Sequence, residues 1–170
     1  GLYVTHELSF DTFHQNSTRL YRILRQSELG QGESYYHSGT SGPLAETLRR
    51  EIPEIDDTVR RMSWGEVWVQ YEEKGFRQRF CMTDANFFEI FSFPLLEGNP
   101  KEVLTQPNTV VITESIASKY FGSINPVGKV ISVTDKYFVG EYEITGVAKD
   151  TPSNSHIRFD FVSASKHQSF

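Results

Sequence analysis

The sequence predicts an α+β fold, and three observations indicate it. Between residues 67 and 82, apolar and polar residues alternate as they do in half-buried strands. Between residues 44 and 52, apolar residues recur every fourth position, as along one face of a helix. In residues 83–156, short apolar runs are separated by turn and helix-cap signals, and few side chains are chemically reactive. This combination predicts a well-defined fold. It also predicts a protein that functions through its shape and its surface contacts and not through a nucleophile or a metal.

The first 62 residues predict short elements around a glycine-rich loop. Ser9 is expected to cap a short helix over 11–16, and a strand is expected over 20–27. Four glycines in residues 30–42 predict a mobile loop.

A helix is then expected to begin at Pro43, which suits a first helical turn. Its apolar stripe consists of Leu44, Leu48 and Ile52, and Pro53 ends it. A short strand over 59–62 follows.

A β-hairpin is predicted next. Val67, Val69 and Tyr71 share one face of its first strand, and residues 73–75, with the sequence EKG, are expected to form the turn. The second strand alternates in the same way and carries Phe76, Gln78, Phe80 and Met82.

Residues 87–170 predict further helices and strands. Helical spacing at 87–91 stops before Pro94, and the sequence NPKE at 99–102 is a helix-start signature. A buried strand is expected over 110–112. A helix should follow it, capped by Thr113 and Glu114 and stopped by Gly122. The last three strands are expected over 129–133, 141–149 and 157–162.

The phenylalanines at 87, 88, 91 and 93 allow two interpretations. Packing in the core is the first. The second is that part of this set forms an exposed contact patch for a partner, because contiguous apolar surface often marks an interface.

Composition excludes several classes of function. The formal net charge is −5, and the basic doublets at 49–50 and 60–61 lie among acidic residues, so a nucleic-acid surface is not expected. Cys81 is the only cysteine, which rules out an internal disulfide. No apolar run approaches the ~18 residues of a membrane span, and no signal peptide is evident, as expected for an excised domain.

The reactive residue types form no recognisable catalytic or metal-binding pattern. The five histidines lack metal-ligand spacing. Ser155, His156 and Asp160 have the residue types of a catalytic triad, but an adjacent Ser and His cannot generally reach each other. Asp56 and Asp57 are expected to be solvated.

A phosphate-binding loop is also absent, because the sequence around Gly128-Lys129 lacks the glycine and hydroxyl that the motif requires. We therefore predict no catalytic, cofactor-binding or metal-binding residues and no cofactor.

Six segments, taken in order, resemble one protein family. They read TDANFF at 83–88, FPLLEG at 93–98, VVITES at 110–115, YFG at 120–122, NPVGK at 125–129 and TGV at 145–147, the last followed by Asp150. Upstream, ELSFD at 7–11, FH at 13–14 and RLYR at 19–22 are similar to the start of the same family. The family is the MacB-like periplasmic core domain of ABC-transporter permeases, in the FtsX superfamily.

The resemblance implies two lobes, a porter-like βαβ lobe with a smaller mixed α/β lobe inserted into it. Residues 1–18 would be a juxtamembrane lead-in with a short helix, and 19–64 the first part of the porter-like lobe. Residues 65–150 would be the inserted lobe, and 151–170 would hold a return strand to the porter-like lobe, which is expected to be incomplete. This arrangement predicts that the strand over 157–162 pairs beside residues 20–25.

The resemblance also implies a non-catalytic extracytoplasmic domain that couples cytoplasmic ATP hydrolysis to export or lipoprotein handling by conformational relay. Its partners would be a cytoplasmic ATPase domain or subunit, reached through membrane helices, and a periplasmic adaptor or second permease copy. The full protein would lie at the periplasmic face of the bacterial inner membrane, and this fragment would be soluble and monomeric.

An alternative is a free-standing periplasmic module that binds a peptide or glycan. An apolar span of about 20 residues next to this sequence in the gene would distinguish the two.

Overall fold

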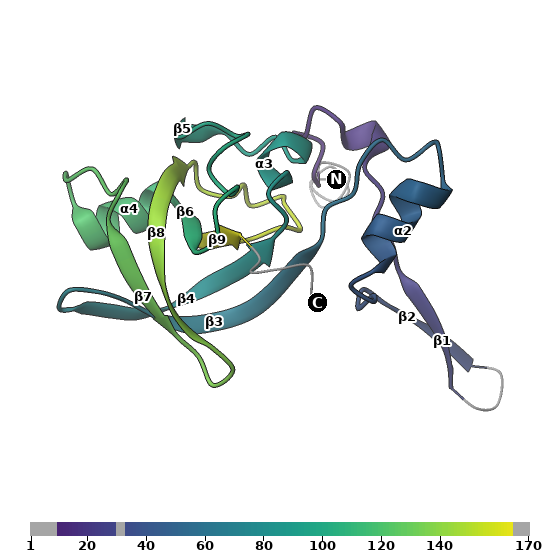
Figure 1. Ribbon diagram of the computed structural model, residues 1–170, viewed down its shortest axis with the longest axis horizontal. Coiled ribbons are helices and arrows are strands. Elements are labelled where there is room, and N and C mark those ends of the chain that lie inside the picture. The colour runs from purple at the N-terminus through teal and green to yellow at the C-terminus, as the bar shows by residue number, and fades with distance from the viewer. Residues whose placement is uncertain (1–9, 30–32, 165–170) are drawn as a thin grey trace, which may run out of the picture.

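One mixed sheet organises the residues that the computed structural model describes, 10–29 and 33–164 (Figure 1). Its strand order is β5-β8-β6-β9-β4-β3-β7. The strands are β3 (Arg61–Tyr71), β4 (Lys74–Thr83), β5 (Leu95–Glu97), β6 (Thr109–Thr113), β7 (Val130–Thr134), β8 (Val139–Ala148) and β9 (Phe161–Ala164). Because β7 also pairs with β8, all of these strands except β5 close into a barrel, and β5 lies at an edge.

The predicted hairpin is confirmed as β3 and β4. Val69 lies opposite Phe76, and Tyr71 lies opposite Lys74. The turn therefore consists of Glu72 and Glu73, one residue earlier than predicted. The alternating pattern places Val67, Val69 and Phe80 inside the barrel, where each is at most 1% exposed.

The sheet separates two apolar cores. The inner core fills the barrel and includes Phe80, Ile112, Tyr142 and Phe161. The outer core lies on the other face of β4, β6 and β9 and is built largely from phenylalanines. It includes α3 (Phe87–Ile90), with Phe87, Phe88 and Phe93 buried and Phe91 half-buried. The prediction that these phenylalanines pack in a core is confirmed.

The predicted helix after β6 is α4 (Glu114–Phe121), which packs against the inner core. Tyr120 donates its hydroxyl hydrogen to the carbonyl of Val69 at 3.1 Å, which attaches the helix to β3. Gly122 ends the helix with a φ of 63°, as predicted. Thr113 occupies the N-cap position without a side-chain capping bond; the N–H of Ser115 donates instead to Asp150, at 3.2 Å.

Residues 17–29 and 33–52 form an arm that lies to one side of the barrel (Figure 1). It consists of η1 (Ser17–Arg19), β1 (Arg25–Leu29), β2 (Glu33–His37) and α2 (Leu44–Glu51), and within the described part of the chain β1 and β2 pair only with each other. The helix predicted after Pro43 is confirmed, although none of its residues is buried. Large apolar side chains of the arm are exposed: Tyr21, Ile23, Leu24, Tyr35, Tyr36 and Ile52.

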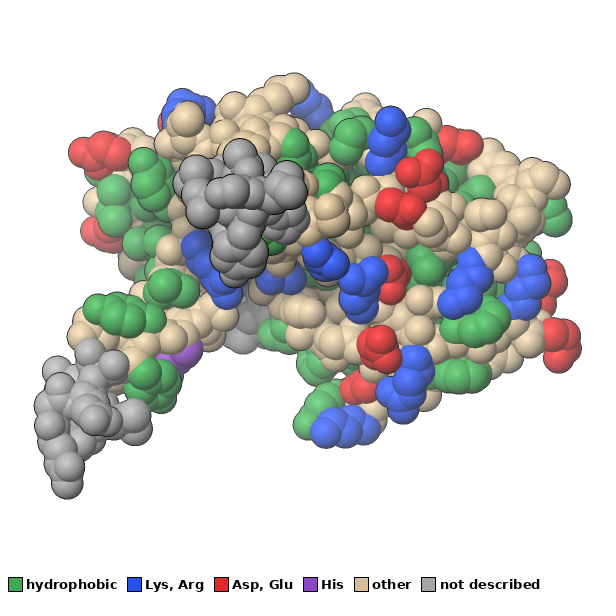
Figure 2. Space-filling model, turned by 180° about the vertical axis from the view of Figure 1, so that it is seen from behind, with side chains coloured by type: hydrophobic (Ala, Val, Ile, Leu, Met, Phe, Trp, Pro, Cys, Tyr) green, Lys and Arg blue, Asp and Glu red, His purple; other side chains and the backbone are tan. Residues whose placement is uncertain are grey.

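From the opposite side, Figure 2 shows hydrophobic side chains on the projecting arm, while acidic and basic side chains are interspersed over the body. No large basic face is visible in this view.

Several predicted elements of the first part of the chain are wrong or displaced. Residues 11–16 form turns, with only the short 3-10 helix η1 after them, because Asp11 adopts a φ of 55° that an α-helix does not allow. The strand expected over 20–27 begins at Arg25, and the strand expected over 59–62 begins at Arg61. The glycine-rich segment is not simply a loop, because residues 33–37 form β2, while 30–32 lie outside the described residues.

In the second part of the chain, the helix expected from Asn99 is a single turn. The Asn99 side chain accepts a hydrogen bond from the N–H of Lys101 at 3.1 Å, and its carbonyl accepts one from Val103. Residues 105–108 then turn into β6 instead of extending the helix. The strands predicted over 129–133 and 141–149 are confirmed as β7 and β8.

The expected return strand pairs differently. β9 begins at Phe161, and it lies between β4, to which it is parallel, and β6, to which it is antiparallel. It does not pair with residues 20–25, so the placement of this strand in the sheet of the first lobe is wrong. Its four residues are all buried, and that burial on both faces requires the centre of a large sheet.

Candidate functional site

The residue types of a catalytic triad are present near β9, but they take part in separate contacts. Asp160 forms an ion pair with Arg79, with Oδ1 and Nη2 2.8 Å apart. The Ser155 hydroxyl donates to Asp11 at 3.0 Å and accepts from the N–H of Ile157 at 3.1 Å. Since His156 contacts Asp11 and not Ser155, the histidine is not placed to act as a base toward this hydroxyl.

Neither a metal centre nor a reactive thiol is formed by the described residues. Nowhere among residues 10–29 and 33–164 do three His, Cys, Asp or Glu side chains gather as metal ligands. Burial raises the pKa of the Cys81 thiol to about 11, so the thiolate is disfavoured at neutral pH. For the whole chain, the absence of catalytic, cofactor and metal residues stays a prediction.

One polar contact joins Asp11, near the first of the described residues, to the loop before β9. Asp11 accepts hydrogen bonds from Ser155, from the N–H of His156 at 3.2 Å and from His156 Nδ1 at 2.7 Å. Its own N–H donates to the carbonyl of Asn154 at 3.0 Å. We call this contact, together with that of His14, the N-terminal junction. It connects residues more than 140 positions apart through one carboxylate.

His14 completes the N-terminal junction from inside the outer core. It is 2% exposed, and its ring lies among Phe13, Phe91 and Phe93. Its Nδ1 accepts a hydrogen bond from the N–H of Ser92 at 3.1 Å, which requires an unprotonated Nδ1. Its Nε2 lies 4.0 Å from Asp11 Oδ1, beyond hydrogen-bond distance. The site therefore favours neutral His14.

The pKa values of both groups make the N-terminal junction sensitive to acid. Burial lowers the pKa of His14, and nearby Asp11 only partly opposes this. For Asp11, burial acts to raise the pKa, but hydrogen bonds from His156 and Ser155 outweigh it together, so the pKa is lowered. Below a pH of about 6.5 the unfolded chain protonates His14 before the folded chain does, so stability falls as pH falls. The Asp11 contribution is present above about pH 3.9 and is lost as pH falls through the lower folded pKa.

We therefore predict that His14→Asn makes stability less dependent on pH. The asparagine side-chain oxygen can accept the hydrogen bond from Ser92 but does not titrate. Urea unfolding between about pH 7.5 and 5 should show the wild-type free energy of unfolding falling more steeply than that of the variant. Equal slopes for wild type and His14→Asn would contradict the prediction.

A second contact, the connector junction, joins the segment after α2 to the start of α3. Asp84 accepts from the N–H of Arg60 at 2.7 Å and from its guanidinium, with Nη2 to Oδ1 also 2.7 Å. Thr83 donates its hydroxyl hydrogen to the carbonyl of Arg60 at 2.8 Å. Asn86 donates to Asp57 at 2.7 Å and to the carbonyl of Thr58 at 3.0 Å. The polar residues of the TDANFF segment thus hold the chain where it passes from the arm into β3.

Sequence reasoning did not find either junction. The TDANFF segment was recognised as a family feature, but no role for its side chains followed from its spacing. For Asp11 and His156 no local signal exists, since their partners are distant in sequence. Once β9 is placed in the centre of the sheet, the loop at 154–156 is brought within reach of Asp11.

The described residues thus form a barrel and an arm that are held by two polar junctions, and solved structures share this fold. A domain of a protein described as a permease from Porphyromonas gingivalis is 25% identical, with a TM-score of 0.69, covering 84% of this chain and 62% of that one. The periplasmic region of MacB from Actinobacillus actinomycetemcomitans is 18% identical, with a TM-score of 0.59, covering 83% and 62%.

The extracellular domain of the noncanonic ABC-type transporter YknZ from Gram-positive bacteria is 15% identical, with a TM-score of 0.50, covering 66% of this chain and 56% of that one. The model of the MacB-like periplasmic core domain matches residues 1–169, and the chain belongs to this family. A comparison with curated proteins found no match.

The comparison covers only part of the solved relatives. The chain spans about three-fifths of the length of the first two solved relatives. Among the described residues, no helix is both long and apolar enough to cross a membrane. The family resemblance inferred from the six sequence segments is confirmed, and so is the mixed α/β fold class; the division into two lobes at the predicted boundaries stays a prediction.

Proposed function

We propose that this chain is a non-catalytic periplasmic domain that relays movement in an ABC-transporter permease of the bacterial inner membrane. Cytoplasmic ATP hydrolysis would be coupled through it to export or to lipoprotein handling. The observation that carries the proposal is the N-terminal junction, in which Asp11 binds the loop at 154–156. In this family the start of the domain follows the first membrane helix, so a movement of that helix would reach Asp11 first.

The relay would run from Asp11 into the centre of the sheet. The loop at 154–156 leads into β9, which pairs on both sides and is fully buried. Since a packed core resists continuous deformation, displacement of this loop would move the barrel as a unit. The connector junction would pass the same movement to the arm, because Asp84 binds both the backbone and the side chain of Arg60.

The partners follow from the same proposal. They would be a cytoplasmic ATPase domain or subunit and, outside the membrane, an adaptor or a second permease copy. The alternative of a free-standing peptide- or glycan-binding module is not favoured, because the matching family consists of permease domains.

The relay can be tested in the full-length permease with its ATPase, in lipid vesicles. Spin labels at Tyr36→Cys on the arm and Tyr137→Cys on the barrel, both exposed positions, report the distance between the two parts. We expect this distance to change on ATP addition, and the change to be lost in Asp11→Ala while ATP hydrolysis continues. Asp56→Ala is the control, because its ion pair with Arg19 is solvent-exposed and should contribute little. A distance that stays the same with and without ATP in the unmutated background would refute the relay.

A further inference from the structure

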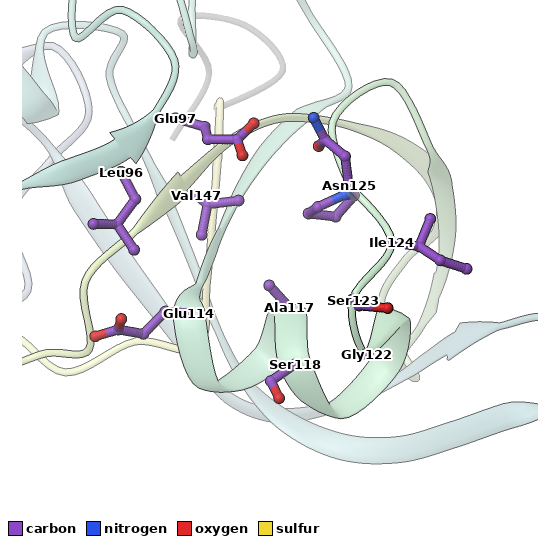
Figure 3. Close-up of a pocket in the computed structure, with 11 residues that line it drawn as sticks. Leu96, Glu97, Glu114, Ala117, Ser118, Gly122, Ser123, Ile124, Asn125 and Val147 are labelled. Atoms are coloured by element: carbon purple, nitrogen blue, oxygen red, sulfur yellow. The ribbon is translucent and has the colours of Figure 1, made fainter.

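A groove lies between α4, the loop that follows it and the edge strand β5 (Figure 3). Its volume is about 330 Å³, at the lower end of the range for ligand sites. Figure 3 shows Leu96, Val147 and Ala117 around the same space, with Asn125 across from them and Ile124 at the outer margin. The groove is open to solvent and is not part of either junction.

Five of the family segments meet at this groove. FPLLEG contributes Leu96 and Glu97, VVITES contributes Glu114, TGV contributes Val147, YFG contributes Gly122, and NPVGK contributes Asn125 and Pro126. Most other residues of these segments are buried or lie in turns. Leu96, however, is 48% exposed, and Ile124, which lies between two of the segments, is 63% exposed. The fold thus gathers these segments around a surface on which Leu96 and Ile124 are exposed, while Ala117 is half-buried and Val147 is buried.

The charged residues that line the groove are all acidic. Glu97 and Glu114 are among its lining residues, whereas no Lys or Arg is. Within the described residues neither carboxylate forms an ion pair; Glu114 only accepts a hydrogen bond from the N–H of Asp150, at 3.3 Å. An occupant with positive charge would therefore meet two carboxylates without competition from a neighbouring cation of the groove.

We infer that the groove binds a short segment of a partner protein that carries a leucine-sized aliphatic side chain next to lysine or arginine. The aliphatic side chain would lie on Leu96, Ala117 and Val147, and the flanking cations would approach Glu97 and Glu114. The size of the groove fits one or two side chains, and β5 pairs only with β8 among the described residues, so its outer edge is free for an extended peptide. The inference extends the proposed function by giving the chemistry of its periplasmic partner.

A pair of peptides tests the inference on the 170-residue chain. Both have eight residues and alternate leucine with a charged residue, lysine in one and glutamate in the other. In a methyl-detected NMR titration at low salt, the lysine peptide should shift the signals of Leu96, Ala117, Ile124 and Val147. Its affinity should fall at least about fivefold in the Glu97→Gln/Glu114→Gln variant, as expected when two charge contacts are removed. Ile124→Ser, at an exposed position that does not support the core, should weaken binding as well.

The other outcomes would overturn the inference. Equal binding of the glutamate peptide would show that charge does not select the occupant. Shifts confined to the arm would place the binding surface elsewhere. Shifts of the groove signals with protein concentration alone would identify a second copy of the chain as the occupant. Because this titration uses the isolated chain and the relay experiment uses the full transporter, failure of one leaves the other interpretable.

Discussion

Phe121→Ala is expected to lower the free energy of unfolding by about 3–5 kcal/mol, the usual cost of deleting a large aromatic side chain from a core. Phe121 is 5% exposed and belongs to the inner core of the barrel. Its ring centroid lies 4.4 Å from that of Tyr71 on β3, so it joins the end of α4 to the long hairpin. Truncation would leave a cavity at this contact that the closed barrel cannot easily fill. Urea unfolding, followed by circular dichroism, measures the change.

The matched control is Tyr21→Ala, which deletes an aromatic side chain that is 85% exposed on the arm. Its effect should stay within about 0.5 kcal/mol, as for most surface substitutions. A loss below about 1 kcal/mol for Phe121→Ala would show that α4 is peripheral to the stability of the barrel.

Local periodicity predicted the elements whose environment is uniform along their length. The hairpin of β3 and β4 was predicted from alternation, because one face of each strand meets the same barrel core throughout. The helix α4 was predicted from its stripe and its terminal glycine, because these signals act within one element. Strong local patterns and a single buried face coincide in both cases.

The elements that were wrong depend on contacts distant in sequence. Asp11 adopts a positive φ while its carboxylate binds residues 154–156, and neither fact is visible from its neighbours. β9 has buried residues on both faces, so its pattern does not show which strands flank it. The family resemblance suggested a return to the first lobe, but the pairing with β4 and β6 is set by the packing of the whole barrel.

The candidate junctions were missed for a related reason. The residues of the connector junction occur in a family segment, yet their role depends on Arg60 being brought alongside Asp84 at the start of β3. The buried position of His14 depends on phenylalanines about 80 residues away. Sequence patterns identify which residues are unusual, whereas the sheet topology decides which of them meet.

Gly98→Ala is expected to destabilise the fold by about 2–4 kcal/mol, the sum of overpacking and backbone strain. Gly98 has a φ of +101°, and a Cβ there would lie 2.5 Å from Val103 Cγ1 and 3.0 Å from the carbonyl oxygen of Thr145. Val103 is buried, and its carbonyl accepts a hydrogen bond from Thr145, so neither neighbour can easily move. Gly146 lies on the other side of this contact, where a Cβ would be 2.8 Å from the carbonyl oxygen of Glu97. The two glycines of the FPLLEG and TGV segments thus allow β5 to approach β8.

Gly65→Ala separates the two contributions to this effect. Gly65 also has a positive φ, of +71°, but no atom lies within 4 Å of the position of its Cβ. Its replacement should therefore cost only the backbone strain, about 1 kcal/mol. The difference between the two variants in urea unfolding measures the additional cost of placing a Cβ at Gly98 against Val103 and the Thr145 carbonyl of β8. If both variants lost the same amount, the steric contact at Gly98 would be unimportant, and the glycine would be needed only for its φ. A larger loss for Gly98→Ala would show that the residue after β5, and with it one wall of the groove, lies too close to Val103 and β8 to accommodate a Cβ.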